Sequence, residues 1–198
     1  MFITITTVIS NCLTSYEQSL YVRKYAYEYC QIQSSLPTHT KLQVLYLARE
    51  GNTRQIVNEK EILDSLSLLS QNISIDKVHF APLSFSQQVS FMVRTDIVFG
   101  VHGAGFVNIL FLLPNSGVFE LFPRRYHKLH YQHMANKAKL FYRCLKNNPT
   151  RKETDPALID RIRVASRDGN IIVKKEIVYY LFKRLINDVR VNKYKFYS

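Results

Sequence analysis

The sequence has little cysteine, glycine and proline, has no tryptophan, and contains no long apolar run. Its 198 residues include 3 Cys, 6 Gly and 6 Pro, and 46% of them are hydrophobic. This composition excludes a small disulfide scaffold, a collagen-like rod and a disordered tail, and it is sufficient for one packed core. Because charges or amides interrupt the apolar residues every few positions, no stretch approaches the roughly 20 residues of a membrane-spanning helix. We therefore expect one folded domain and no membrane span.

Motifs for metal binding and nucleophilic catalysis are also lacking. The cysteines are too scattered for a zinc site, which needs closely spaced ligands: Cys12, Cys30 and Cys144. The sequence contains no Asp-x-Asp pair, no Gly-x-Ser-x-Gly and no Gly-Lys-Ser/Thr. Three histidines recur at every third position of a predicted helix, without a carboxylate or Cys beside them: His127, His130 and His133. We interpret them as a partly exposed polar stripe, and we expect neither a metal ion nor a cofactor.

The net positive charge of the chain comes from its C-terminal third. The net charge is +12, but residues 1–122 hold 8 Lys and Arg against 9 Asp and Glu, whereas residues 123–198 hold 19 against 6. Aromatic residues are interspersed with these charges and offer surfaces on which bases can stack: Tyr179, Tyr180, Phe182, Tyr194, Phe196 and Tyr197. A nucleic-acid binder is therefore one alternative, although a solvated basic face explains the pattern more simply. Steep salt dependence of RNA binding would support the alternative.

Short apolar segments alternate with segments of helical periodicity through the middle of the chain. We predict helices over residues 16–33, 56–69, 84–93, 106–111, 126–138 and 171–189, and strands over residues 41–47, 78–80, 96–99, 117–121 and 140–142. This alternation is typical of βαβ units, so we expect an α/β fold with a Rossmann-like parallel sheet and helices on both faces. We divide the chain into an N-terminal helical segment (1–40), the Rossmann-like domain (41–145) and a basic loop and C-terminal helix (146–198).

Two capping boxes mark expected helix starts. Asn52 is followed three residues later by Gln55, and Ser84 is followed by Gln87 at the same spacing. After the last predicted strand, residues 146–160 are polar and contain Asn-Pro and Asp-Pro, so we expect a loop there.

A glycine-rich turn over residues 100–105 is the most informative segment. It has the sequence Gly-Val-His-Gly-Ala-Gly and lies where a predicted strand gives way to a predicted helix. In a parallel sheet this edge binds ligands, and glycines allow backbone N–H groups to approach an anion. The positive end of the helix dipole adds to that attraction. Glu120 lies at the end of the next strand, where a carboxylate can accept hydrogen bonds from a ribose. Together the two features indicate a nucleotide.

A second cluster of polar residues follows the first strand of the alternating part. Arg49 comes directly after that strand, and we place Arg54 in the first turn of the following helix, with Asn58 and Glu59 beyond it. A cation is unfavourable at the positive end of a helix dipole, which suggests a bound anion. We expect both arginines at the same sheet edge as the glycine-rich turn.

Three blocks of sequence follow Arg49 in a distinctive order: residues 54–61, residues 101–114 and residues 120–123. On these blocks the chain resembles glycosyltransferase family 61 over about residues 42–145. The members of that family include the EGF-domain and the protein O-linked-mannose N-acetylglucosaminyltransferases and plant xylosyltransferases. The resemblance implies the C-terminal, donor-binding half of a GT-B fold, in which two Rossmann-like domains face a cleft.

The resemblance also implies an activity. It suggests inverting, metal-independent transfer of N-acetylglucosamine or xylose from a UDP-sugar to a hydroxyl of a glycoprotein or glycan, in the lumen of the endoplasmic reticulum or Golgi. Arg49 and Arg54 would neutralise the donor diphosphate, the turn would lie beneath it, and Glu120 would contact the ribose. Asn58 and Glu59 would either contact the donor or organise the arginines. The donor-binding residues that we predict are Arg49, Arg54, Asn58, Glu59, His102, Gly103, Ala104, Gly105, Asn108 and Glu120.

The chain departs from the family pattern in two respects. Residues 113–117 read Leu-Pro-Asn-Ser-Gly where the family usually has Pro-Pro-Gly or similar. At most about 40 residues precede the first strand, so we expect the acceptor domain and the general base to lie outside this chain. The first ten residues lack the basic segment of a signal peptide. Asn72 begins a glycosylation sequon, which matters only in the secretory pathway.

Two further alternatives remain beside the nucleic-acid binder. The chain could be a non-catalytic relic that binds nucleotide sugars, in which case it would bind UDP without transferring a sugar. A nicotinamide-dependent oxidoreductase also needs a glycine-rich turn and a downstream Glu, but its Gly-x-Gly-x-x-Gly order is broken here by Asn108.

Overall fold

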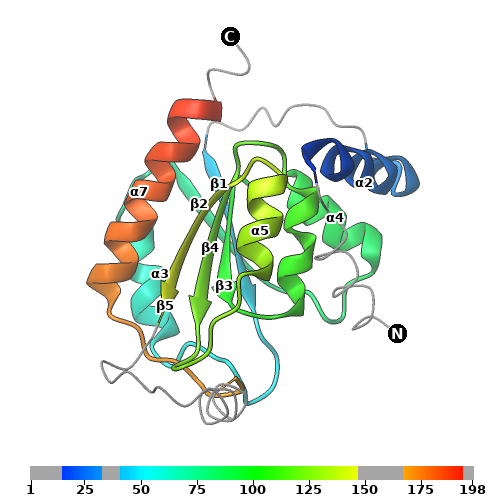
Figure 1. Ribbon diagram of the computed structural model, residues 1–198. Helices are drawn as coiled ribbons and strands as arrows, with labels where there is room; N and C mark the ends of the chain where they lie inside the picture. Colours follow the sequence, from blue (N-terminus) through cyan, green and yellow to red (C-terminus); the bar gives the residue numbers. More distant parts are fainter. Residues whose placement is uncertain (1–14, 33–40, 147–166, 194–198) are drawn as a thin grey trace.

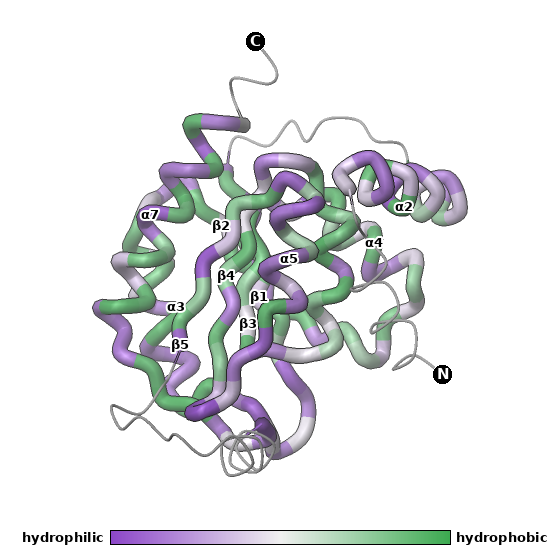
Figure 2. Tube along the Cα trace, viewed as in Figure 1, coloured by the Kyte–Doolittle hydropathy of each residue, from purple (hydrophilic) through white to green (hydrophobic). Residues whose placement is uncertain are grey.

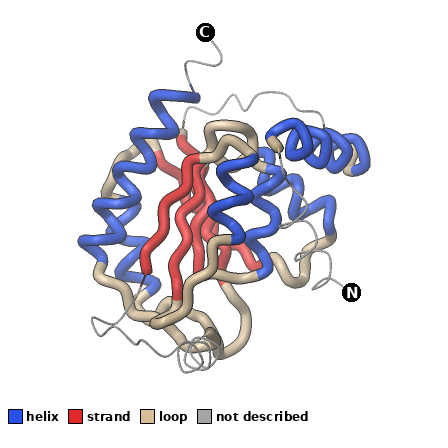
Figure 3. Tube along the Cα trace, viewed as in Figure 1, coloured by secondary structure: helices blue, strands red, loops and turns tan. Residues whose placement is uncertain are grey.

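A computed structural model describes residues 15–32, 41–146 and 167–193. At its centre lies a parallel sheet of five strands with the order β2-β1-β3-β4-β5 (Figures 1 and 3). The strands are β1 (Leu42–Ala48), β2 (Ile73–His79), β3 (Ile97–Val101), β4 (Gly117–Phe122) and β5 (Phe141–Lys146). The central strands β3 and β4 are buried at every position, as expected for a parallel sheet that is covered on both faces. The predicted α/β, Rossmann-like fold is confirmed.

Helices cover both faces of the sheet (Figure 1). One face packs against α2 (Tyr16–Tyr29), α4 (Phe85–Val93), the 3-10 helix η1 (Ala104–Phe111) and α5 (His130–Lys137). The other face packs against α3 (Glu59–Ser67) and α7 (Lys175–Lys193). In Figure 2 the hydrophobic residues concentrate along the strands and on the helix surfaces that meet them. Each face therefore has its own apolar core.

The C-terminal helix α7 belongs to the core of the sheet. Phe182 of α7 makes edge contacts with Phe99 at 5.5 Å and Phe119 at 5.9 Å between ring centroids. A Cβ added at Gly117 would lie 3.0 Å from Cγ of Leu185, so α7 packs very closely on β4. The basic side chains on the opposite side of α7 and at the residue before it are exposed: Lys174, Lys175, Lys183 and Arg184. The aromatic residues at positions 194, 196 and 197 lie outside the described residues.

The capping box at Ser84 is confirmed, but the one at Asn52 is wrong. The Ser84 side chain accepts from the backbone of Gln87, and the Gln87 side chain accepts from the backbone of Ser84. In contrast, α3 begins only at Glu59, so residues 52–58 are not helical. They instead pair with a distant segment, since Ile56 forms a parallel bridge with Ile171. Tertiary pairing overrides the local helix signal there.

Other helix boundaries also differ from the prediction. The helix predicted over residues 126–138 begins at His130, and the helix predicted from residue 171 begins at Lys175, because residue 171 belongs to the bridge. The segment over residues 106–111 is a 3-10 helix that begins two residues earlier. Most of the predicted loop over residues 146–160 lies outside the described residues.

The order of the strands places a binding edge between β1 and β3. From β1 the chain passes outward to β2 and then crosses back to β3 on the other side of β1. In open parallel sheets such a switch of direction leaves a crevice at the carboxyl ends of the two strands, where ligands bind. Arg49 follows β1, and the glycine-rich turn follows β3. The fold therefore brings the two predicted clusters to this switch point, at the lower edge of the sheet in Figure 1.

Candidate functional site

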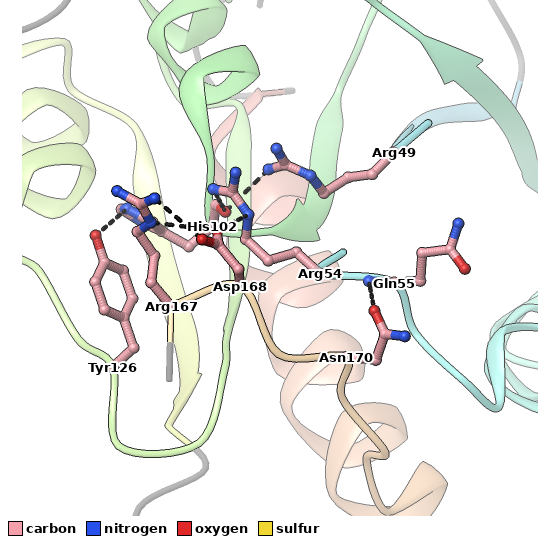
Figure 4. Close-up of polar contacts among 8 residues, drawn as sticks. All are labelled: Arg49, Arg54, Gln55, His102, Tyr126, Arg167, Asp168 and Asn170. Carbon is pink, nitrogen blue, oxygen red and sulfur yellow. Dashed lines mark hydrogen bonds and ion pairs between the residues drawn. The ribbon is translucent and has the colours of Figure 1, made fainter. Parts of the chain in front are cut away.

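Two arginines meet the glycine-rich turn at this edge of the sheet. Nη1 of Arg49 donates to the backbone carbonyl oxygen of His102 at 3.2 Å, and Nη1 of Arg54 donates to the same oxygen at 3.4 Å (Figure 4). The side chains come from a loop after β1, and the acceptor comes from the end of β3. A single carbonyl thus holds two guanidinium groups side by side, as we expected from the ends of parallel strands.

Gly103 leaves the space that the Arg49 side chain occupies. A Cβ built on Gly103 would lie 1.9 Å from Nη1 and 3.0 Å from Cζ of Arg49. The φ angle of Gly103 is 174°, which is extended backbone that any residue can adopt. Glycine is therefore required at this position for space rather than for conformation. The η1 helix begins directly after it, at Ala104, and the first N–H groups of a helix have no partner within that helix.

The site concentrates positive charge in a partly buried place. Burial lowers the pKa of Arg49, and the neighbouring positive charge of Arg54 lowers it further. Two guanidinium groups beside one carbonyl oxygen repel each other, so an anion that binds both would stabilise the folded site. The arrangement favours the binding of an anion.

Arg54 is held by a ladder between residues 54–58 and residues 167–173. Its backbone N–H donates to the carbonyl of Asp168 at 3.3 Å, and Ile171 donates to the carbonyl of Gln55 at 2.8 Å. Asn170 and Val173 extend the ladder by bonds to Gln55 and Asn58, respectively. Arg54 itself has a left-handed φ of 56°, which is unusual for a residue with a side chain. The ladder explains how that conformation is maintained.

Two residues of this ladder were missed by sequence reasoning. Nε of Arg54 lies 3.4 Å from Oδ1 of Asp168, an ion pair without hydrogen-bond geometry. Arg167 donates to both carboxylate oxygens of Asp168, at 3.2 and 3.0 Å. Figure 4 shows these charged groups gathered around the turn at His102. No local pattern indicates their position, because they lie more than 110 residues from Arg54 in sequence.

The imidazole of His102 is part of a buried polar network. Its Nδ1 bonds with Oε1 of Glu120, whose other oxygen accepts from the hydroxyl of Tyr142. Nε2 lies 3.5 Å from the hydroxyl of Tyr126, and the ring stacks on Phe122 with centroids 5.1 Å apart. Glu120 has no exposed surface. Its carboxyl group therefore faces the interior in this structure, and the predicted ribose contact stays a prediction.

The pH dependence of the free energy of unfolding tests this network through the phenol of Tyr142. Burial and the adjacent Glu120 carboxyl raise its pKa far above the ordinary value of 10.0. The folded chain thus keeps the phenolic proton after the unfolded chain loses it, so the stability that Tyr142 contributes is complete below pH 10 and is lost as the pH rises above it. We expect the free energy of unfolding, measured by urea titration between about pH 9 and 11.5, to fall less steeply in Tyr142→Phe. Equal slopes would show that this phenol titrates normally.

Three further predicted residues, Asn58, Glu59 and Asn108, make contacts with neighbouring elements. Asn108 of η1 donates to Gln88 at 3.0 Å and to the carbonyl of Gly105 at 3.1 Å, so it joins η1 to α4. Asn58 binds the backbone of Val173. The described contacts of Glu59 are with Tyr46 and Lys77, on the side of β1 and β2. These contacts indicate supporting positions rather than groups that face the arginines.

Residues 15–32, 41–146 and 167–193 contain neither a membrane-spanning helix nor a metal-binding cluster. No helix in those ranges is long and apolar enough to cross a membrane. No group of three or more His, Cys, Asp or Glu side chains in the same ranges is arranged to hold a metal ion.

A family model and several known proteins match part of this chain. The family model for glycosyltransferase 61 matches residues 3–119. EGF domain-specific O-linked N-acetylglucosamine transferases align with the chain at 35% identity over 86 residues in Drosophila melanogaster and 36% over 87 residues in Rattus norvegicus. Each alignment covers 43% of this chain and only 16% of the relative. Since the family model covers more than half of the sequence, the chain belongs to glycosyltransferase family 61.

Proposed function

We propose that this chain binds the UDP-sugar donor of an inverting, metal-independent glycosyltransferase. The observation that carries the proposal is the pair of guanidinium groups that converge on the His102 carbonyl, beside the start of η1. Guanidinium groups and helix N-termini are the groups that recognise phosphate in proteins. Their position at the switch point between β1 and β3 is where nucleotides bind in open parallel sheets.

The proposed role in the reaction is stabilisation of the leaving group. In an inverting transfer the acceptor oxygen forms a bond to the anomeric carbon while the bond between that carbon and the UDP oxygen breaks. Negative charge then develops on the diphosphate, and fixed positive groups lower the free energy of that transition state. Arg49 and Arg54 supply those charges here, which makes a divalent metal unnecessary. The proton of the acceptor hydroxyl would pass to a base that we do not assign to this chain.

The donor sugar that we propose first is N-acetylglucosamine, with xylose second. The support for the first is the name of the relatives, which are EGF domain-specific O-linked N-acetylglucosamine transferases. The acceptor is then a hydroxyl of a glycoprotein or glycan. We propose the lumen of the endoplasmic reticulum or Golgi as the compartment. The sequon residue Asn72 is exposed in the turn before β2, where a glycan has room.

Arg54→Ala is expected to weaken UDP binding about 10- to 100-fold, because a charge-assisted contact to the diphosphate is lost. Isothermal titration of the chain with UDP measures this change. Arg94→Ala is the matched control, since Arg94 is an exposed arginine just before β3, at the opposite edge of the sheet. The control variant also removes one positive charge, and its UDP affinity should stay within about twofold of the wild-type value. Equal affinity of wild type and Arg54→Ala would contradict the assignment.

A second measurement distinguishes sugar transfer from binding of UDP without catalysis. Release of UDP from UDP-N-acetylglucosamine or UDP-xylose, with and without a glycoprotein acceptor, reports bond cleavage. Binding of UDP without cleavage of either sugar nucleotide would support the non-catalytic alternative for this chain by itself. Cleavage that depends on Arg49 and Arg54 would support the proposed enzyme.

A further inference from the structure

A carboxylate already lies among the arginines of the candidate site. Oδ1 of Asp168 is 3.4 Å from Nε of Arg54, and both of its oxygens accept from Arg167. The hydrogen bonds and charge of Arg167 hold the pKa of this carboxyl below its ordinary value, and the positive charges of Arg54 and Arg49 lower it further. Figure 4 shows the Asp168 carboxylate beside the guanidinium of Arg54. A carboxylate presents two oxygens to guanidinium groups in nearly the same geometry as a phosphate.

The Asp168 side chain is partly exposed, whereas its backbone is bonded to the chain beside the site. The carbonyl of Asp168 accepts from Arg54, and Asn170 and Ile171 continue the ladder, so the main chain stays beside the site. The Asp168 side chain, in contrast, is 44% exposed, and the Arg167 side chain is 51% exposed. Ion pairs at such exposure are weak, so an incoming anion of higher charge can displace the carboxylate at small cost.

We propose that Asp168 takes the position of the donor diphosphate before the donor binds and that Arg167 is a third arginine that binds this diphosphate. The inference depends on the proposed function, because it names further residues of the same donor site. When UDP binds, the carboxylate rotates away from Arg54, and Arg167 exchanges its carboxylate contacts for phosphate oxygens. Asp168 therefore competes with the donor, while Arg167 contributes to donor affinity.

The competition is measured by titrating wild type, Asp168→Asn and Arg167→Ala with UDP. Asp168→Asn keeps the size of the side chain and removes the competing charge, so UDP should bind about two- to fivefold more tightly. Arg167→Ala should bind UDP about 5- to 10-fold more weakly. Asp64→Asn is the control, because Asp64 is an exposed acid on α3 that pairs with Lys60. It changes the net charge equally and should leave the affinity unchanged.

A double variant shows whether Asp168 acts through Arg54. If the carboxylate competes for that arginine, Asp168→Asn should give a clearly smaller gain in affinity in an Arg54→Ala background than in wild type, since only its competition for Arg167 is left. A gain of equal size in both backgrounds would reveal a general charge effect and overturn the inference.

The inference and the proposed function fail in different ways. Wild-type chain that does not bind UDP would overturn both. Wild type that binds UDP, with Arg54→Ala weakened but Asp168→Asn and Arg167→Ala unchanged, would overturn only the inference. Thermal unfolding of each variant verifies that the fold is retained.

Discussion

Gly103→Ala is expected to lose about 10- to 100-fold in UDP affinity while its fold stays intact. The added methyl group would lie 1.9 Å from Nη1 of Arg49, so the guanidinium must leave its place on the His102 carbonyl. The clash is with the far end of a flexible side chain, and the extended φ of 174° accepts alanine without strain. The midpoint of thermal unfolding should therefore change by less than about 3 °C. Titration with UDP and a thermal melt of the same sample give both values.

Gly105→Ala is the matched control in the same turn. A Cβ at Gly105 would be 3.8 Å from its nearest neighbour, Cδ1 of Leu47, which is an ordinary van der Waals contact. This variant should bind UDP as wild type does. Loss of affinity in both variants would mean that the turn tolerates no side chain, independently of Arg49. Retained affinity in Gly103→Ala would mean that Arg49 does not hold the diphosphate from its observed position.

The convergence of the two arginines on the turn was predictable from sequence. Alternating strands and helices indicate a parallel sheet, and the carboxyl ends of parallel strands lie at one edge. Arg49 comes directly after one strand and His102 directly after another, so their proximity follows from the topology alone. The strand order places them next to each other, because β1 and β3 are neighbours.

The local conformation of Arg54 was not predictable in this way. Asn52 and Gln55 have the spacing of a capping box, which is a signal within four residues. The competing interaction, the bridge between Ile56 and Ile171, joins segments more than 110 residues apart. A local pattern cannot indicate such a partner, and for the same reason it gave no sign of Arg167 or Asp168.

The orientation of Glu120 was equally hidden from the sequence. In a strand that is exposed on one face, alternation shows which side chains point outward. Every residue of β4 is buried, so alternation carries no such information there. A Glu at the end of a strand is usually solvated, whereas this one bonds with His102 and Tyr142 inside the fold.

Glu120→Ala is expected to lower the free energy of unfolding by about 3–5 kcal/mol, the usual cost of breaking a buried polar pair. The change leaves Nδ1 of His102 and the hydroxyl of Tyr142 without their acceptor and opens a cavity beneath the turn. The midpoint of thermal unfolding should fall by about 10 °C for a chain of this size. Urea titration followed by circular dichroism measures the free energy directly.

Glu59→Ala is the appropriate comparison, because Glu59 also accepts from a tyrosine hydroxyl, at 2.9 Å from Tyr46. Its side chain is 29% exposed, so water can replace the lost carboxylate, and the expected cost is about 1 kcal/mol. A larger loss for Glu59→Ala than for Glu120→Ala would contradict the assignment of Glu120 to the buried network. If Glu120→Ala destabilises the fold more than Glu59→Ala does, the network beneath the turn is a structural support for the carbonyl that holds both arginines. Donor affinity and stability should then decline together in Glu120 variants, whereas Gly103→Ala changes affinity alone.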